Sequence, residues 1–169
     1  YMGKITKNIT AVALNECELK EFYDLDLSNY PSLDKVRDLF IVSVNTGLRF
    51  NELYQVSRDN IKNDPDQAKG KLLAITGKTG STAKIEINEV VDQVLQKYRY
   101  HLPAVASINI VNSCLKNICR MVDSLNKLIM IDVTIDGTKE LKAFKKYEVI
   151  SVHAGRKTFV NNRRLSPHR

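Results

Sequence analysis

The segment that decides how this chain is interpreted is Thr46-Gly47-Leu48-Arg49-Phe50-Asn51-Glu52-Leu53. Gly47 lies where a glycine ends a helix, and the apolar spacing before it predicts a helix beginning at Ser32. A short helix is predicted directly after the glycine. The guanidinium of Arg49 at this joint suits a phosphate group, and Glu52, one helical turn later, is placed to orient it. Taken alone, the segment also fits a surface arginine beside a turn.

A second segment, His153-Ala154-Gly155-Arg156-Lys157-Thr158-Phe159, lies in a helix predicted to start near His153. A histidine and an arginine three residues apart on a helix project in the same direction, so His153 and Arg156 can bind one phosphate together. Lys157 adds positive charge beside them. The alternative is a solvated or DNA-facing helix without catalytic chemistry.

A β-hairpin is predicted between these segments, with strands over 72–76 and 83–87 around Thr79-Gly80-Ser81-Thr82. Lys78 lies near its tip, where a lysine can reach into a cleft or serve only solubility. The string Gly77-Lys78-Thr79 is not a phosphate-binding P-loop, because Leu72 occupies the position of the required first glycine and a strand follows instead of a helix.

Helix and turn signals elsewhere predict a mostly helical α+β domain with small antiparallel β-elements. Asn15, Asn88 and Asn109 are each predicted to cap a helix, the first running to about Leu25. The short helix after Gly47 extends over about 49–56. Apolar residues alternate from 131 to 135 toward Asp136-Gly137, which predicts a second hairpin turn before the lysine-rich stretch 139–146. With no internal repeat and no linker, 1–169 is expected to be a single domain.

Composition excludes several classes of protein. Of the 169 residues, 43% are hydrophobic and 27% charged, which is typical of a globular protein and not of a disordered one. No apolar stretch is long enough to cross a membrane and no signal peptide begins the chain, so no membrane partner and a cytoplasmic location are expected. The cysteines Cys17, Cys114 and Cys119 have no zinc-ligand spacing, and Cys114 and Cys119 are expected to pack as small apolar side chains.

Positive charge is concentrated toward the end of the chain. The formal net charge is +7, and the segment 138–169, with nine basic and two acidic residues, carries all of that excess. A basic segment of this kind points to nucleic acid as the partner, although a solvated lysine face is an equal alternative. The candidate DNA contacts are Lys139, Lys142, Lys145, Lys146 and Lys157.

In order, the pattern TGLR-x-x-E, a hairpin lysine and H-x-x-R on a late helix resembles the catalytic domain of the tyrosine recombinases, the phage-integrase family. The resemblance extends from about Asn15 to Phe159 and is greatest to integrases of bacterial mobile elements. It implies the helical DNA breaking-rejoining fold with a small antiparallel sheet. It also implies site-specific recombination or integration of double-stranded DNA through a 3′-phosphotyrosyl intermediate, without a cofactor or a metal.

The resemblance also implies a role for each matching residue. Arg49 and Arg156 match the arginines that clamp the scissile phosphate and stabilise charge on its non-bridging oxygens. His153 matches the histidine that contacts the phosphate and assists proton transfer. Lys78 matches the lysine that protonates the 5′-oxygen leaving group, and Glu52 matches a supporting acid. Lys71 and Lys84 are further candidates for the lysine role, and Gly155 and Lys157 replace the family's leucine and second histidine.

The family nucleophile, a tyrosine beyond the second arginine, has no match here. The chain ends thirteen residues after Arg156, and all seven tyrosines precede His153; Tyr147 is the nearest, and the tail around His168 matches nothing in the family. The expectation is therefore a recombinase fragment that lacks the nucleophile segment and the N-terminal core-binding domain. We expect the fragment to be monomeric and inactive in strand cleavage, whereas whole family members act as tetramers on DNA.

Three other interpretations stay open. A non-catalytic DNA-binding protein would use the basic C-terminal segment for the DNA backbone and give Arg49 and Lys78 no special role. A helical interaction module would carry its lysines for solubility and would not bind DNA. A type I topoisomerase shares the phosphotyrosine chemistry, and the residues alone do not separate it from a recombinase.

Overall fold

The computed structural model describes residues 5–6, 12–63, 70–104 and 107–165. Most of the regular structure is helical, with two small antiparallel sheets, which confirms the predicted α+β class. The α-helices are α1 (Glu16–Asp24), α2 (Pro31–Thr46), α3 (Glu89–Lys97), α4 (Ile108–Arg120) and α5 (His153–Leu165). Short 3-10 helices are η1 (Phe50–Gln55), η2 (Arg58–Asn60), η3 (Asp123–Asn126) and η4 (Lys146–Val149). Among these described helices, none is both long and apolar enough to span a bilayer.

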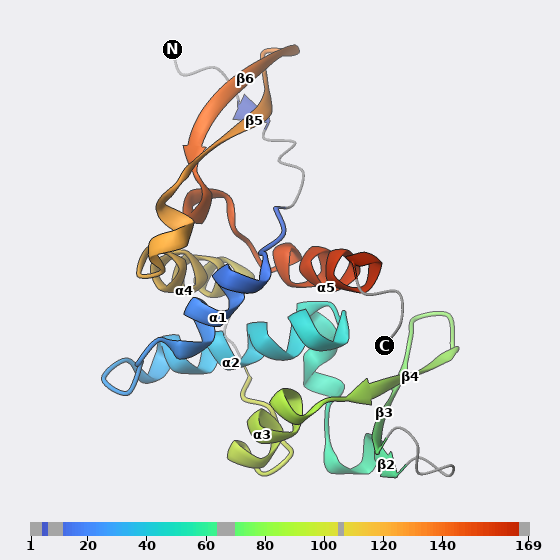
Figure 1. Cartoon of the computed structure of the whole chain (residues 1–169). Coiled ribbons are helices and arrows are strands. Elements are labelled where there is room, and N and C mark those ends of the chain that lie inside the picture. Colours follow the sequence, from blue (N-terminus) through green and yellow to red (C-terminus); the bar gives the residue numbers. More distant parts are fainter. Residues whose placement is uncertain (1–4, 7–11, 64–69, 105–106, 166–169) are drawn as a thin grey trace.

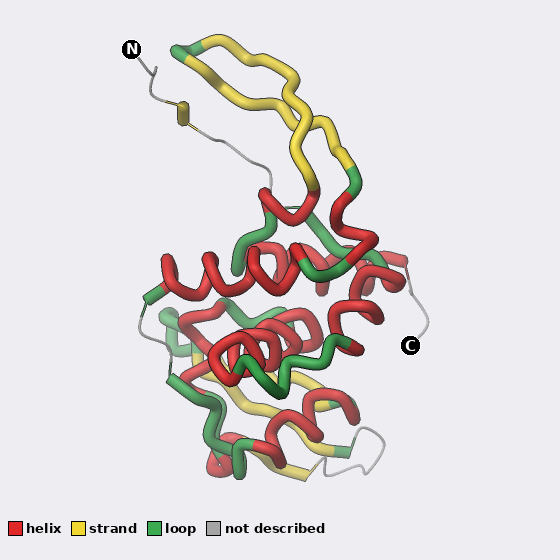
Figure 2. The backbone as a smooth tube through the Cα atoms, turned by 90° about the vertical axis from the view of Figure 1, so that its left-hand side faces the viewer, coloured by secondary structure: helices red, strands yellow, loops and turns green. Residues whose placement is uncertain are grey.

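Two separate three-stranded sheets lie at opposite ends of the molecule (Figures 1 and 2). One has the order β2-β3-β4, formed by β2 (Ile61–Asn63), β3 (Lys71–Thr76) and β4 (Thr82–Ile87). The other has the order β1-β5-β6, formed by β1 (Ile5–Thr6), β5 (Leu128–Ile135) and β6 (Thr138–Lys145). The β5–β6 hairpin projects away from the helices, whereas β3 and β4 lie beside them.

Helix α2 is the central element of the core. It contacts every other α-helix, η1 and β4, and most of its surface is buried. Phe40 is fully buried and packs its ring 5.4 Å from that of Phe22 on α1. At the α3 side, buried Asp38 accepts hydrogen bonds from the Lys97 ammonium (2.6 Å) and the Tyr98 hydroxyl (2.9 Å). A buried carboxylate needs such partners, so this cluster fixes α3 against α2.

Most of the predicted boundaries are confirmed. Asn15 caps α1 in a capping box with Glu18, and Asn88 caps α3. Gly47 ends α2 with a φ of 73°, and Asp136-Gly137 forms the two-residue β5–β6 turn. The buried Cys119 and half-buried Cys114 pack with the apolar core, and burial, with Glu18 nearby, raises the pKa of the Cys119 thiol to about 12.

Two helix starts differ from the prediction, and one short strand was not predicted. Helix α4 starts at Ile108 and not after Asn109, because the Ser107 hydroxyl accepts from the Ile110 N–H and caps the helix two residues earlier. Helix α2 starts at Pro31, one residue before Ser32, because proline fits the first helical position, where no N–H donor is needed. The strand β2 was missed, since three residues are too few to show an alternating pattern.

Helices α2 and α5 approach closely because each presents a glycine to the other. A Cβ added at Gly155 of α5 would lie 2.6 Å from the Ser43 Oγ and 3.4 Å from the Phe40 ring on α2. A Cβ added at Gly47 would lie 2.5 Å from the Phe159 ring on α5. Any side chain at either position would therefore push the two helices apart.

We expect Gly155→Ala to lower the free energy of unfolding by about 1–3 kcal/mol, because the new methyl group overlaps Ser43 in a packed interface. Gly77→Ala is the matched control, since a Cβ there meets only Ser81 atoms at 3.7 and 4.0 Å. Urea unfolding of both variants measures the difference. Equal stability of the two would show that α5 can shift without cost, contrary to this packing.

One buried carboxylate on α1 binds both ends of the β5–β6 hairpin at its base. Glu18 is fully buried, and its Oε1 and Oε2 lie 2.6 Å and 2.7 Å from the ammonium groups of Lys127 and Lys146. Lys127 precedes β5 and Lys146 follows β6. Burial raises the pKa of Glu18, but hydrogen bonds from both lysines outweigh it, so the net pKa lies below the ordinary value of 4.5.

We expect Glu18→Gln to lower the free energy of unfolding by about 3 kcal/mol at pH 7, because Lys146 is then buried without a counter-charge. A carboxyl whose pKa is lower in the folded state stabilises the fold above its unfolded pKa, and this stabilisation disappears as the pH falls through the folded pKa. The difference between wild type and variant should therefore shrink as the pH falls below the ordinary carboxyl pKa of 4.5. Lys20→Ala, which breaks the exposed pair with Asp24, is the control expected to change little. A difference that is constant with pH would contradict this assignment.

Candidate functional site

The turn after α2 is fixed by the hydroxyl groups of two buried residues. The Ser43 hydroxyl donates to the Leu48 carbonyl (2.8 Å), and the Thr46 hydroxyl donates to the Val42 carbonyl (2.7 Å). Thr46 Oγ1 also accepts from the Leu48 N–H (3.3 Å). Gly47 adopts the left-handed conformation, and these hydrogen bonds fix the backbone of the turn from Thr46 to Leu48. The backbone therefore sets the position of Arg49, which follows this turn.

Arg49 follows Leu48, and it is held at the surface between two buried neighbours. Leu48 and Phe50 are buried, whereas the Arg49 side chain is 64% exposed. Its N–H donates to Glu52 Oε2 (2.8 Å), and its guanidinium lies 3.8 Å from Glu52 Oε1. Glu52 thus binds both the backbone and the side chain of Arg49, which orients the guanidinium while leaving most of it open to an anion.

Helix α5 presents its predicted residues on the face opposite its buried one. Gly155 and Thr158 are buried, and Thr158 Oγ1 accepts from the Leu14 N–H (2.9 Å). His153, Arg156 and Lys157 are exposed. Because Gly155 packs on α2 and Phe159 packs on Gly47, the structure brings this helix and the Arg49 turn together.

Lys78 lies on a separate element, the tight turn between β3 and β4. The Gly77 N–H donates to the Ser81 carbonyl (2.9 Å) and the Gly80 N–H to the Gly77 carbonyl (3.0 Å), so the tip is a closed turn. The Lys78 side chain is exposed. The hairpin is joined to α2 at its base, where Asn88 after β4 donates to Asn45 Oδ1 (2.8 Å). Among the described residues, no hydrogen bond or ion pair links Lys78 to the arginines.

The two further lysine candidates differ in their surroundings. The Lys71 ammonium lies 2.8 Å from a carboxylate oxygen of Asp92 and 3.3 Å from the Tyr100 hydroxyl. The hydrogen bond that Lys71 donates to Asp92 raises the pKa of Lys71, which makes it a poorer proton donor. Lys84 is exposed in the middle of β4, opposite Ala74 of β3. Lys78 and Lys84 therefore remain accessible, and Lys71 is committed to a structural pair.

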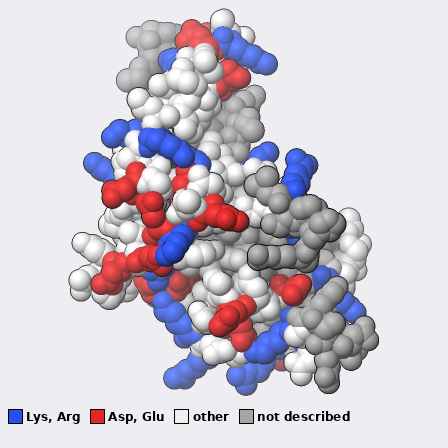
Figure 3. Space-filling view, viewed as in Figure 1, with Lys and Arg blue, Asp and Glu red and all other residues white. Residues whose placement is uncertain are grey.

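The basic C-terminal segment does not form one surface. Lys157 lies on α5, whereas Lys139, Lys142 and Lys145 lie on the projecting hairpin. Lys146 is only 7% exposed and is bound to Glu18. On the face shown in Figure 3, basic and acidic side chains are interspersed. Residues that are close in sequence are thus separated in space, because the chain turns from β6 through η4 into α5.

One cation near the site was missed by the sequence interpretation. The Arg163 guanidinium lies 4.9 Å from the centre of the Phe159 ring, and the same ring contacts Gly47. The i,i+4 spacing of Phe159 and Arg163 on one helix was a signal for this contact. Arg163 therefore adds a fourth basic side chain to the outer part of α5.

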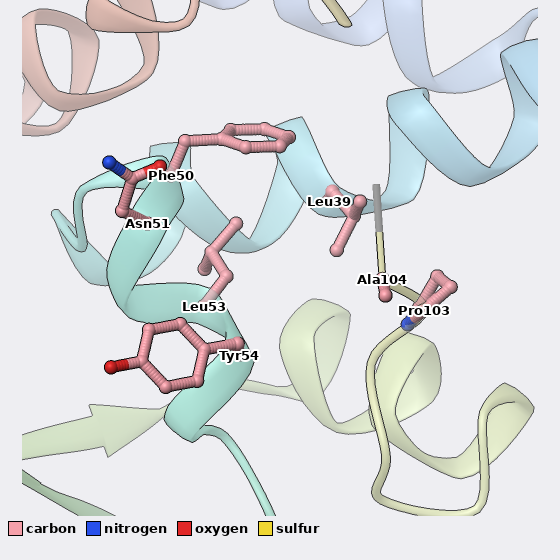
Figure 4. A pocket seen from close by; sticks show the side chains of 7 residues that line it. All are labelled: Leu39, Phe50, Asn51, Leu53, Tyr54, Pro103 and Ala104. Carbon is pink, nitrogen blue, oxygen red and sulfur yellow. The ribbon is translucent and has the colours of Figure 1, made fainter. Parts of the chain in front are cut away.

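A pocket of about 290 Å³ lies beside η1, and no predicted site residue is among its lining residues. Its lining residues are Leu39, Phe50, Asn51, Leu53, Tyr54, Pro103 and Ala104. Figure 4 shows the Asn51 amide and the Tyr54 hydroxyl pointing away from Leu39, so apolar side chains dominate the interior. No carboxylate, histidine or basic group is among the described residues that line it. In the described parts of the chain, no group of three His, Cys, Asp or Glu side chains is arranged to hold a metal ion.

Comparison with known proteins gives structural likeness only. No protein-family model matches the sequence, and no curated protein is similar to it. The solved structure of XerH site-specific recombinase bound to difH substrate, a pre-cleavage complex, is 15% identical with a TM-score of 0.62, over 100% of this chain and 47% of that one. The post-cleavage complex of XerH with palindromic difH is 14% identical with a TM-score of 0.59, over 93% and 43%.

The chain thus spans less than half the length of the recombinase chains that it matches. At this identity the likeness concerns the backbone and not the chemistry of individual side chains. The backbone likeness nevertheless extends over 93–100% of this chain. The chain has the α+β fold of the tyrosine recombinase catalytic domain.

Proposed function

We propose that this chain binds duplex DNA and activates one backbone phosphate for site-specific recombination. The observation that carries the proposal is the reciprocal glycine packing of α2 and α5, which places the Arg49 turn beside the helix that exposes His153 and Arg156. The recombinase complexes with the same fold are bound to DNA substrates. The shared fold supports a function on DNA by analogy, and the exposed basic side chains supply the groups that would bind a phosphate.

In the proposed mechanism, Arg49 and Arg156 bind the non-bridging oxygens of the scissile phosphate. Charge on these oxygens grows as the phosphorus becomes five-coordinate, so donors placed there stabilise the transition state more than the ground state. Glu52 holds the Arg49 guanidinium in place. His153, exposed one turn before Arg156, assists proton transfer at the nucleophile.

Lys78 is proposed to protonate the 5′-oxygen that leaves. It is exposed at the tip of the β3–β4 hairpin, and the base of this hairpin is hydrogen-bonded to α2. The tip can therefore approach bound DNA while the base keeps its position. Lys71 is left out of this role, because its pair with Asp92 holds its proton. Lys157 is proposed to add a backbone phosphate contact beside Arg156, and Lys146 is left out, since it is buried against Glu18.

The nucleophile of the full reaction is not assigned to a residue of these 169. All seven tyrosines precede His153 in sequence, and Tyr147 is half-buried against the core. In the test of this proposal, an aryl phosphate attached to the DNA takes the place of the phosphotyrosine. A nicked duplex with a 3′-(p-nitrophenyl) phosphate and a facing 5′-hydroxyl reports the rejoining half-reaction. The 5′-oxygen bonds to phosphorus, p-nitrophenolate leaves, and the hydroxyl proton passes to the neutral amine form of Lys78 or to solvent.

We expect the chain to release p-nitrophenolate and join the strands on nicked duplexes with randomised flanks, because the phosphate site acts without a tyrosine. Arg49→Ala and Arg156→Ala should each lower the joining rate about 10²–10³-fold. Arg99→Ala, an exposed arginine after α3, is the matched control and should leave the rate unchanged. If DNA is bound but never joined, the chain is a non-catalytic DNA-binding protein, and the catalytic assignment is wrong.

DNA affinity should fall steeply with salt, since contacts to phosphates release counterions. Each of Arg49→Ala and Arg156→Ala should weaken binding uniformly across sequences and reduce the salt slope by about one. Fluorescence anisotropy over a salt series measures both effects. Binding that does not vary with salt would argue against a phosphate-binding face, and an absence of binding at low salt would favour a helical interaction module.

A further inference from the structure

Within the residues that the structure describes, the outer edge of the β5–β6 hairpin is unpaired. Strand β1 pairs with β5 at Ile5 and Thr6, so β6 forms the opposite edge of this sheet. No strand in the described part of the chain pairs with β6 on that outer side. The hairpin also projects from the body in both views (Figures 1 and 2), so the helices leave this edge uncovered. An open strand edge is a template for pairing with another strand.

The turn determines which residues of β6 direct their backbone groups outward. Asp136 and Gly137 have φ values of 48° and 82°, and Ile135 pairs with Thr138 directly across this two-residue turn. In such a hairpin the flanking pair exchanges both N–H···O bonds, and the pattern alternates along the strand. Thr138, Glu140 and Lys142 therefore bond to β5, whereas Lys139, Leu141 and Ala143 direct N–H and C=O outward.

The charged side chains of this hairpin balance one another. Lys139, Lys142 and Lys145 are balanced by Asp132, Asp136 and Glu140, so residues 128–145 carry three charges of each sign and no net charge. The same hairpin exposes large apolar side chains. They are Leu128 (69% exposed), Met130 (57%) and Leu141 (61%). Exposed apolar groups with balanced charges are typical of a protein contact.

We propose that β6 pairs antiparallel with β6 of a second copy of this chain, with Leu141 opposite Leu141 on a twofold axis. Regular antiparallel pairing requires outward-directed residues to face each other, which leaves three central registers. Centring on Glu140 places two glutamates opposite each other, and centring on Lys142 places two lysines opposite each other. Centring on Leu141 places Glu140 opposite Lys142 of the second copy twice, so charge selects this register.

The selected register also suits the other side chains of the strand. The two Leu141 side chains become neighbours on one face, and Lys139 lies opposite Ala143 instead of another lysine. Lysines on an edge strand ordinarily oppose pairing with other chains. Here Glu140 lies between Lys139 and Lys142 and makes one register with a second copy favourable. The lysines that disfavour pairing with other strands therefore favour pairing with a second copy of this chain.

This interface is small, and we expect a weak dimer that matters when two copies are held close together. The proposal departs from the monomer expected from the sequence. It does not rest on the proposed DNA function, because it uses only the hairpin. Either proposal can therefore fail while the other holds.

Sedimentation velocity over a concentration series tests the charge pairing. Wild type should self-associate, and Glu140→Lys and Lys142→Glu should each weaken association about tenfold although they change net charge in opposite directions. The exchange of both residues, Glu140→Lys with Lys142→Glu, should restore association. Lys116→Glu on the exposed face of α4 is the control and should have no effect. A monomer at all concentrations, or a double variant that stays as weak as the single ones, overturns the proposal.

Cysteine cross-linking tests the register. In a background with the exposed Cys17 replaced by serine, Leu141→Cys should give a disulfide-linked dimer on mild oxidation. Paired residues on a twofold axis have Cα atoms about 5.5 Å apart, within the range for a disulfide. Glu140→Cys and Lys142→Cys report the two rival registers and should cross-link much less. Preferential cross-linking at either rival position, or no cross-linking at all, contradicts the Leu141-centred pairing, and circular dichroism confirms that each variant is folded.

Discussion

The close contact between α2 and α5 is the constraint on which the candidate site depends. Gly47 and Gly155 come from opposite ends of the sequence, and each removes the side chain that would hold the two helices apart. Gly47 has a second function, since its left-handed conformation ends α2 and releases the chain toward Arg49. One residue therefore sets both the end of a helix and the distance to the neighbouring helix, and the groups that we propose bind phosphate are positioned by that geometry.

A second constraint keeps the two ends of the molecule independent. Glu18 binds the lysines at both feet of the β5–β6 hairpin, and its own helix is packed on α2 through Phe22 and Phe40. The hairpin is thus fixed at its base and open along its length. The sheet at the other end is tied to the helices through Lys71, Asp92 and the hydrogen bond from Asn88 to Asn45. Each sheet is anchored through polar contacts of its own, so a partner at one end leaves the contacts of the other end intact.

Local signals predicted most of the fold, because caps and turns depend on few neighbouring residues. Asn15, Gly47, Asn88 and Asp136-Gly137 act within four residues of themselves, and each is confirmed. The α4 start was wrong because Ser107 and Asn109 are comparable caps and only the fold chooses between them. The packing of Gly155 on Ser43 and the burial of Lys146 depend on residues more than a hundred positions away, which no local pattern contains.

The difference between local and long-range contacts also explains why the basic C-terminal segment does not correspond to one basic surface. Net charge along a sequence predicts a surface only when neighbouring residues stay neighbours in space. Here Lys146 is neutralised by Glu18, the β6 lysines are balanced within their own hairpin, and only the basic residues of α5 lie beside Arg49. The basic residues therefore fall into three groups: Lys146 in a buried ion pair, the β6 lysines on the strand edge that we propose pairs with a second copy, and the α5 residues on the face that we propose binds phosphate. Because these have different partners, a substitution in one class changes stability, self-association or DNA chemistry separately.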